Sequence, residues 1–225
     1  MNNASLHHAI IRSFLDRQRP PSHAELSERF GCSPDAVRAG LRALADDHGV
    51  VLHPHSDAVW VAHPFSAAPT ACLVRAEGKT WWASCIWCAL GLAHLAGGTA
   101  TIEARHGGLG PPVCLRLEGG ALLDPAHCVH FPIPMQRAWD NVHFTCAVML
   151  LFPNPAAVAD WCAERGVPHG DVRPLAQVSA FAADWYARHA APDWRKWSLP
   201  EAAALFRRHG LDGPTWALPA AEGRF

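Results

Sequence analysis

Apolar residues recur every three or four positions in the N-terminal third of the chain, which is the spacing of amphipathic helices. Ser22 and Ser33 stand at N-cap positions, and Pro34 follows at the first helical position, where proline is favoured. The pattern therefore predicts three helices. They cover residues 6–16, 24–30 and 34–44.

Two short apolar runs follow the third predicted helix and flank a His-Pro-His-Ser-Asp turn, a pattern typical of a β-hairpin. The runs cover residues 50–52 and 59–61. Three helices followed by a hairpin predict a winged-helix-like module over residues 1–66. Residues 64–69, rich in alanine, serine and proline, are interpreted as the linker to the rest of the chain.

The rest of the chain alternates short β-like runs with helical stretches. Strands are predicted at residues 71–75, 79–82, 99–105, 113–117, 126–131 and 146–152. Helices are predicted from residue 85 and over residues 155–161, 174–189 and 199–209. Ser198 and Glu201 form a capping box at the start of the last helix. The predicted fold class is α+β, a mainly antiparallel sheet with packed helices, and residues 67–225 form this second domain with a C-terminal helical extension.

Composition points to a small-molecule protein. The 225 residues carry a formal net charge of −1, so no electrostatic attraction to nucleic acid or to an anionic membrane is expected. The chain begins without a basic-then-apolar signal segment, and no apolar run reaches the roughly 18 residues that span a bilayer. We therefore expect a cytoplasmic protein with reduced cysteines, of which the chain has 8.

The predicted winged helix raises the question of DNA binding. Its third helix offers two arginines against three aspartates, whereas a surface that follows phosphates is richer in lysine and arginine. These residues are Arg38, Arg42, Asp35, Asp46 and Asp47. A helical cap over the second domain is therefore the favoured interpretation, and DNA is not an expected partner.

Three cysteines are placed where they can act together. Cys85 and Cys88 lie at the predicted start of a helix, and their spacing puts both on one helical face. The positive end of the helix dipole is expected to give Cys85 thiolate character. Cys146 comes later, before an apolar run. Thiolates prefer soft metals, so these cysteines are candidate ligands for one shared ion.

The segments around these cysteines resemble the organomercurial (alkylmercury) lyase family. In the first segment, residues 81–85 read Trp-Trp-Ala-Ser-Cys, and an alanine- and leucine-rich helix follows. In the second, Cys146 and an apolar strand lead to Phe-Pro-Asn at residues 152–154 and to the helix over 155–161. The resemblance covers roughly residues 70–190 and carries function by analogy.

The resemblance implies cleavage of a carbon–mercury bond by thiolates and a proton. Cys85 and Cys146 fill the two cysteine positions of the family. Cys88 stands where the family has an aspartate that relays the proton to carbon. A thiol is a weaker acid than a carboxyl group, with a pKa of about 8.5 against about 3.9, and it is a better ligand for soft metals. The resemblance implies a small organometallic substrate, Hg(II) as product, a thiol donor that removes it, and no required cofactor.

Neighbouring aromatic and imidazole side chains complete the predicted site. Trp81, Trp82 and Trp87 flank the thiols and are expected to wall an apolar pocket for the organic group. His143 lies one helical turn before Cys146 and is a candidate additional metal ligand.

Two other functions stay open. Three thiols also suit a protein that binds or senses a soft metal such as Hg(II), Cu(I) or Zn(II). A third possibility is a lyase-like fold that acts on another organic substrate. A thioredoxin-like redox motif is disfavoured, because the segment before Cys85 is predicted as a hairpin arm rather than as part of a βαβ unit.

Overall fold

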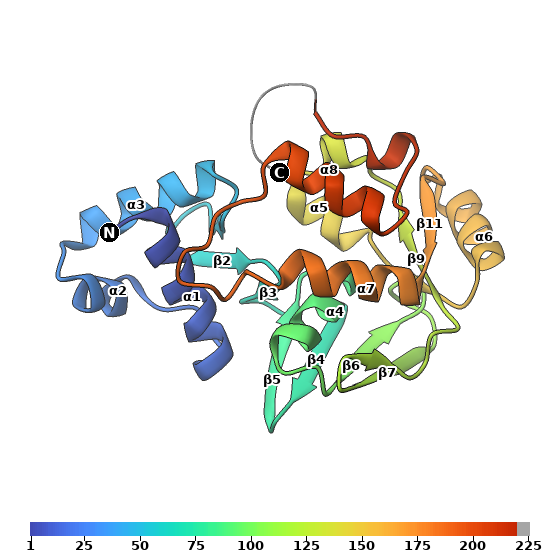
Figure 1. Cartoon of the computed structure of the whole chain (residues 1–225), viewed down its shortest axis with the longest axis horizontal. Helices are drawn as coiled ribbons and strands as arrows, with labels where there is room; N and C mark the ends of the chain where they lie inside the picture. The colour runs from blue at the N-terminus through green and yellow to red at the C-terminus, as the bar shows by residue number, and fades with distance from the viewer. Residues whose placement is uncertain (220–225) are drawn as a thin grey trace.

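The computed structural model describes residues 1–219 (Figure 1). Three helices open the chain: α1 (Asn3–Arg17), α2 (His23–Phe30) and α3 (Pro34–Asp46). Ser22 and Ser33 cap the second and third helices, because their side chains accept hydrogen bonds from the backbone N–H groups of Glu25 and Ala36. The three predicted N-terminal helices are confirmed, and they form the left end of the molecule in Figure 1.

The two arginines of α3 are paired with acidic side chains. Arg38 lies 2.7 Å from the carboxylate of Asp35, and Arg42 lies 2.5 Å from that of Asp57 at the tip of the wing. These ion pairs leave little net positive charge on α3. That DNA is not a partner stays a prediction.

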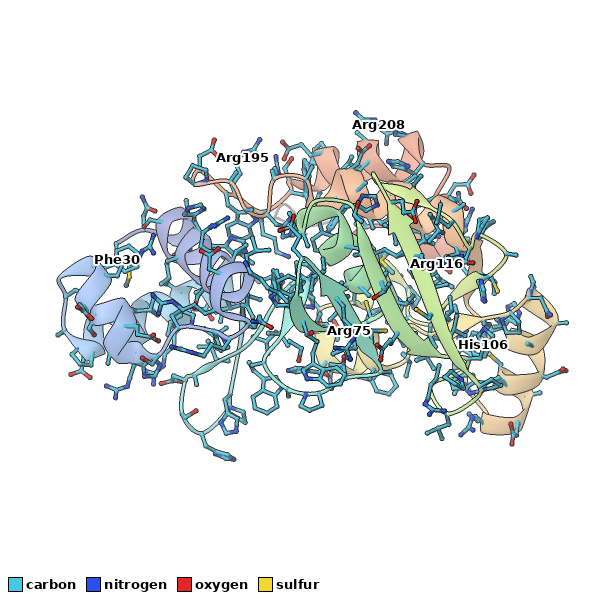
Figure 2. All side chains as sticks on the ribbon, turned by 90° about the horizontal axis from the view of Figure 1, so that it is seen from below. Phe30, Arg75, His106, Arg116, Arg195 and Arg208 are labelled. Carbon is cyan, nitrogen blue, oxygen red and sulfur yellow. The ribbon has the colours of Figure 1, made fainter. Side chains whose placement is uncertain are left out.

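The first sheet has eight strands in the order β1-β2-β3-β5-β4-β6-β7-β8, and neighbouring strands pair antiparallel. The strands are β1 (Val51–Leu52), β2 (Val59–Ala62), β3 (Phe65–Ser66), β4 (Cys72–Ala76), β5 (Lys79–Ala83), β6 (Ala100–Arg105), β7 (Pro112–Glu118) and β8 (Ala121–Leu122). Figure 2 looks at the open face of this sheet, from which Arg75 and Arg116 project. The predicted α+β class is confirmed.

Residues 64–69 are not a linker, and the sequence-based interpretation was wrong here. Phe65 and Ser66 form β3, which pairs with β2 on one side and with β5 on the other. The ring of Phe65 is fully buried and stacks on Phe14 of α1, with the ring centroids 5.0 Å apart. A segment rich in small residues thus enters the sheet because of one buried aromatic ring. The sheet continues unbroken from the wing hairpin, β1 and β2, into the rest of the chain.

Helix α4 (Ile86–Leu95) covers the buried face of the first sheet, and α7 (Leu175–Tyr186) packs on the other side of α4. Helix α4 packs against α7 on one side and against β4, β5 and β6 on the other, which explains why it is apolar all round. Gly91 permits this close approach, because a Cβ atom there would lie 1.9 Å from the ring of Tyr186.

A second sheet of three antiparallel strands has the order β10-β9-β11. The strands are β9 (Cys128–Phe131), β10 (Leu151–Phe152) and β11 (Asp171–Pro174). The predicted strand over 146–152 is correct only at its end, because Val142–Ala147 form the short helix α5. The side chain of Asn141 caps α5 by accepting from the N–H of Phe144. Short apolar runs do not distinguish a strand from a buried helix, which is why the prediction failed.

Two further helices complete the fold, α6 (Pro155–Arg165) beside the second sheet and α8 (Leu199–Arg208) against α7. Short 3-10 turns cover Met135–Arg137 and Pro214–Trp216. The capping box predicted at Ser198 and Glu201 is present. One hydrophobic core cluster extends from α1 to α8, so the N-terminal helices share a core with the rest of the chain. Among residues 1–219, every helix lacks the length and apolar character needed to cross a bilayer.

Candidate functional site

Cys85 and Cys88 lie where β5 ends and α4 begins. Cys85 is the N-cap of α4, and its sulfur accepts a hydrogen bond from the backbone N–H of Cys88 at 3.3 Å. The thiol of Cys85 in turn donates to the sulfur of Cys88, also at 3.3 Å. The predicted pairing of the two thiols at the start of one helix is therefore confirmed.

Cys146 reaches this pair from α5. The buried hydroxyl of Thr145 donates to the carbonyl oxygen of Ala138 at 2.9 Å and helps to fix the helix. The sulfurs of Cys88 and Cys146 and a ring nitrogen of His63 all lie within 4.8 Å of one another. Two thiolates bound at about 2.3 Å to one metal ion are at most about 4.6 Å apart. The observed spacing therefore fits two sulfurs sharing one ion.

His63 is a member of this cluster that the sequence pattern did not reveal. It follows β2, and its Nε2 atom lies 3.6 Å from the sulfur of Cys146. The two residues come from the wing hairpin and from α5, so only the complete fold brings them together. The sequence around His63 has no other residue at ligand spacing, and so no local signal marks it.

Tyr186 and Met149 complete the surroundings of the sulfurs. The hydroxyl of Tyr186 lies 3.3 Å from the sulfur of Cys88, and the sulfur of Met149 lies 3.7 Å from that of Cys85. Tyr186 reaches Cys88 because Gly91 leaves room for its ring against α4. A hydroxyl that donates to a sulfur favours the thiolate form.

The three thiols have different affinities for their protons. Burial, together with the hydrogen bonds to the other two thiols, raises the pKa of Cys85 well above its ordinary value. Its hydrogen bond with Cys85 lowers the pKa of Cys146, but the contact with Cys88 and burial outweigh this and raise it overall. Burial also opposes ionisation of Cys88, yet hydrogen bonds from Cys146 and Cys85 and the charge of His63 lower its pKa well below the usual range. The negative charge therefore resides on Cys88. The expectation of a thiolate at Cys85 was wrong, because its thiol donates to Cys88.

A cavity of about 60 Å³ lies beside Cys88 and Cys146. Its walls are largely aromatic and include Trp87, Trp139 and Trp185, which lie far apart in the sequence. A small aromatic cavity that ends at buried sulfurs is suited to an organic group attached to a soft atom.

The other predicted site residues lie outside this cavity. The Nε1 atom of Trp81 donates to the carbonyl oxygen of Phe14 at 2.6 Å, and Trp82 lies on the open face of the sheet. Successive side chains of a strand point to opposite faces, so two adjacent tryptophans do not wall the same pocket. His143 is exposed and borders a second hollow on another side of Cys146.

All eight cysteines are free thiols. Cys72, at the start of β4, borders the same second hollow as Cys85. Burial raises the pKa of Cys72 to about 12. Such a thiol stays protonated at neutral pH, and Cys72 therefore adds no charge to the cluster.

Comparisons with known proteins place this cluster inside a recognised sequence family. The sequence profile of the family described as alkylmercury lyase matches residues 65–187, which include all three cysteines of the cluster. None of the curated proteins compared with the chain matches it. A solved structure of a mercury-bound form of MerB2 has a similar fold, with a TM-score of 0.67 and 19% sequence identity, and the match covers 83% of this chain and 91% of that one. Since the profile matches more than half of the 225 residues, the chain belongs to the alkylmercury lyase family.

Proposed function

We propose that this protein cleaves the carbon–mercury bond of a small organomercurial and releases a hydrocarbon and Hg(II). The observation that carries the proposal is the meeting of three sulfurs, those of Cys85, Cys88 and Cys146, of which the last two line an aromatic cavity. Thiolates bind soft metals far better than carboxylates do. Family membership points to the same reaction.

The thiols of the protein supply both the sulfur ligands and the proton that the proposed reaction needs. The sulfur of Cys85 binds the mercury of R–Hg–X as its proton passes to the thiolate of Cys88, and X⁻ leaves. Cys88 then gives this proton to the carbon of R as the carbon–mercury bond breaks, and it takes up the proton that Cys146 loses when the sulfur of Cys146 binds the same mercury. The products are R–H and Hg(II) held by two sulfurs, and no oxidation or reduction takes place. A thiol from solution removes the metal.

In this proposal Cys88 takes the place of the aspartate that the resemblance implies. Its sulfur is close to three possible proton partners, the thiols of Cys85 and Cys146 and the hydroxyl of Tyr186. A thiolate holds Hg(II) more tightly than a carboxylate does. We therefore expect bond cleavage to be followed by slow release of the metal.

The test is release of benzene from phenylmercury in excess thiol, measured by gas chromatography together with the mercury that the protein retains. We expect turnover by the wild type and its loss in Cys85→Ala, because the sulfur of Cys85 binds the mercury first and its proton passes to Cys88. Cys114→Ala, which changes an exposed cysteine of β7, is the matched control. Undiminished benzene release by Cys85→Ala would contradict the assignment.

One observation favours a second function, the binding of a soft metal without catalysis. His63, Cys88 and Cys146 offer a nitrogen and two sulfurs within 4.8 Å of one another, and this ligand set suits Zn(II), Cu(I) or Hg(II). If the protein only binds a soft metal, we expect one metal ion per chain, weaker binding of that ion by His63→Ala, and no release of benzene. The same assay therefore separates the two functions.

A further inference from the structure

The aromatic cavity contains three buried nitrogen atoms that no group of residues 1–219 hydrogen-bonds. They are Nδ1 of His7, Nε1 of Trp87 and Nδ1 of His189. These side chains are 1%, 8% and 8% exposed, so they have little contact with solvent. Buried polar atoms in native proteins are almost always hydrogen-bonded. Three exceptions around one cavity indicate a ligand that supplies the missing partners.

The side chains around the cavity select a negatively charged ligand. Lys196 also lines the cavity, and its ammonium group lies 3.9 Å from the centroid of the Trp139 ring. An indole N–H and an ammonium group only donate hydrogen bonds. Among residues 1–219, no aspartate or glutamate lines the cavity. Donors that converge without acidic acceptors fit an anion and not a cation.

The two histidines are held in place as part of the same wall. The ring of His7 stacks on Trp194 with the centroids 3.6 Å apart, and the ring of His189 lies 4.6 Å from that of Tyr186. Burial lowers the pKa of His7 to about 3 and that of His189 well below its ordinary value. Each imidazole is therefore neutral near pH 7 and donates through one ring nitrogen. Because packing fixes the rings, little entropy is lost when they bind a ligand.

We propose that this cavity binds the carboxylate of a small organic ligand, with Lys196, Trp87 and the two buried histidines as donors. This inference rests on the proposed lyase function. If the protein is a lyase, its substrates are organomercurials whose organic group carries a carboxylate. Arg195, the other cationic side chain within residues 1–219 that lines the cavity, is paired with Glu201 at 2.6 Å. The ammonium group of Lys196 therefore matches a single negative charge, and a carboxylate fits better than a doubly charged phosphate. The tryptophans contact the apolar part of the ligand, and the sulfurs lie at the mercury end.

The first test compares 4-carboxyphenylmercury with phenylmercury as substrates, by the ratio of their kcat/KM values. We expect the wild type to prefer the carboxylate, and Lys196→Met to lower the ratio about tenfold or more, because a charge-assisted hydrogen bond is lost. Lys196→Arg keeps the charge and is expected to retain most of the preference. The control is Lys79→Met, which removes the other lysine of the chain, whose Nζ donates to the carbonyl oxygen of Leu15 at 3.0 Å outside the cavity. An unchanged ratio in Lys196→Met, with both substrates cleaved, overturns the carboxylate site and leaves the lyase function intact.

The second test needs no mercury and so separates the two proposals. Calorimetric titration compares benzoate with benzamide, its neutral analogue, on the wild type and on Lys196→Met. We expect the wild type to bind benzoate more tightly than benzamide, and Lys196→Met to lose this preference. That result supports the carboxylate site even if neither organomercurial is cleaved and the lyase function fails. Equal binding of benzoate and benzamide by the wild type overturns the site.

Discussion

We call Cys85, Cys88 and Cys146, which lie beside His63, the thiol cluster. The thiol cluster and the second sheet both bury cysteines beside a histidine, but their sulfur atoms have different partners. We call Cys128, His130 and Cys162 the distal region. There the sulfur of Cys162 lies 3.6 Å from Nε2 of His130, and the thiols of Cys128 and Cys162 donate to the backbone carbonyl oxygens of Phe152 and Pro168. In the thiol cluster the sulfurs contact one another instead.

This difference decides which cysteine can carry a charge. A carbonyl oxygen only accepts hydrogen bonds, so it favours the protonated thiol. Burial raises the pKa of both Cys128 and Cys162, and nothing in the distal region offsets it. In the thiol cluster, the neighbouring thiols donate to Cys88 and lower its pKa despite burial. A reactive cysteine therefore requires convergent donors, and a nearby histidine is not enough.

The largest expected difference in activity is between a variant that lacks one thiol of the thiol cluster and a variant that lacks one thiol of the distal region. Cys146→Ala should slow benzene release from phenylmercury by about a thousandfold or more, because the second sulfur that holds the mercury is lost. Cys162→Ala, a buried cysteine also next to a histidine, should keep wild-type activity. Single-turnover benzene release measures both. Equal losses in the two variants would show that the contrast between the regions has no functional meaning.

Cys88→Asp tests how the sulfur of Cys88 affects proton transfer and the release of Hg(II). A carboxyl group relays a proton more readily and binds Hg(II) more weakly, so turnover should rise about tenfold or more. Mercury retained after cleavage should fall at the same time. The measurements are benzene released and metal bound after gel filtration in excess thiol. Lower turnover together with unchanged metal retention would mean that Cys88 does not act at the aspartate position.

Gly91→Ala tests whether the packing of α7 on α4 supports the cluster. The added Cβ would lie 1.9 Å from the ring of Tyr186, and overpacking of this kind costs about 1–3 kcal/mol. Gly40→Ala in α3 is the matched control, since its Cβ would clash with the flexible end of Met1 and would lie at an ordinary contact distance, 3.5 Å, from Leu6. We expect lower stability in urea for Gly91→Ala alone. Equal stability of the two variants would rule out a tight contact at Gly91.

The buried histidine of the cavity wall gives the smallest expected effect, which depends on pH. Burial, with Lys196 and His8 acting in the same direction, lowers the pKa of His7 from 6.5 to about 3. Between these values the unfolded chain binds more protons than the folded chain, so stability falls as the pH falls below 6.5. At pH 5 the loss amounts to about 2 kcal/mol. His7→Phe keeps the stacking on Trp194 and should remove this part of the loss, which urea unfolding at pH 5 and pH 7 measures. The same loss of stability in both proteins would contradict this role of His7.

Local features of the chain were predictable, and distant contacts were not. The pairing of Cys85 with Cys88 depends on one helical turn, which the spacing of the two residues already indicates. His63 and Tyr186 reach the cluster from β2 and α7, and no short-range pattern marks them. Cys146 was predicted on a strand, because an apolar run does not show that an asparagine cap will start a helix.

The strand β3 also determines what happens if the chain is cut. A protein that begins after residue 66 loses β3, and β5 then becomes the edge of the sheet. The backbone groups of Trp82 and Ala83 would lose their β3 partners, and an apolar edge of this kind pairs readily with other chains. The same cut removes His63 from Cys146. A shortened protein should therefore aggregate. The N-terminal third contributes to the core and also covers a strand edge that would otherwise pair with other chains.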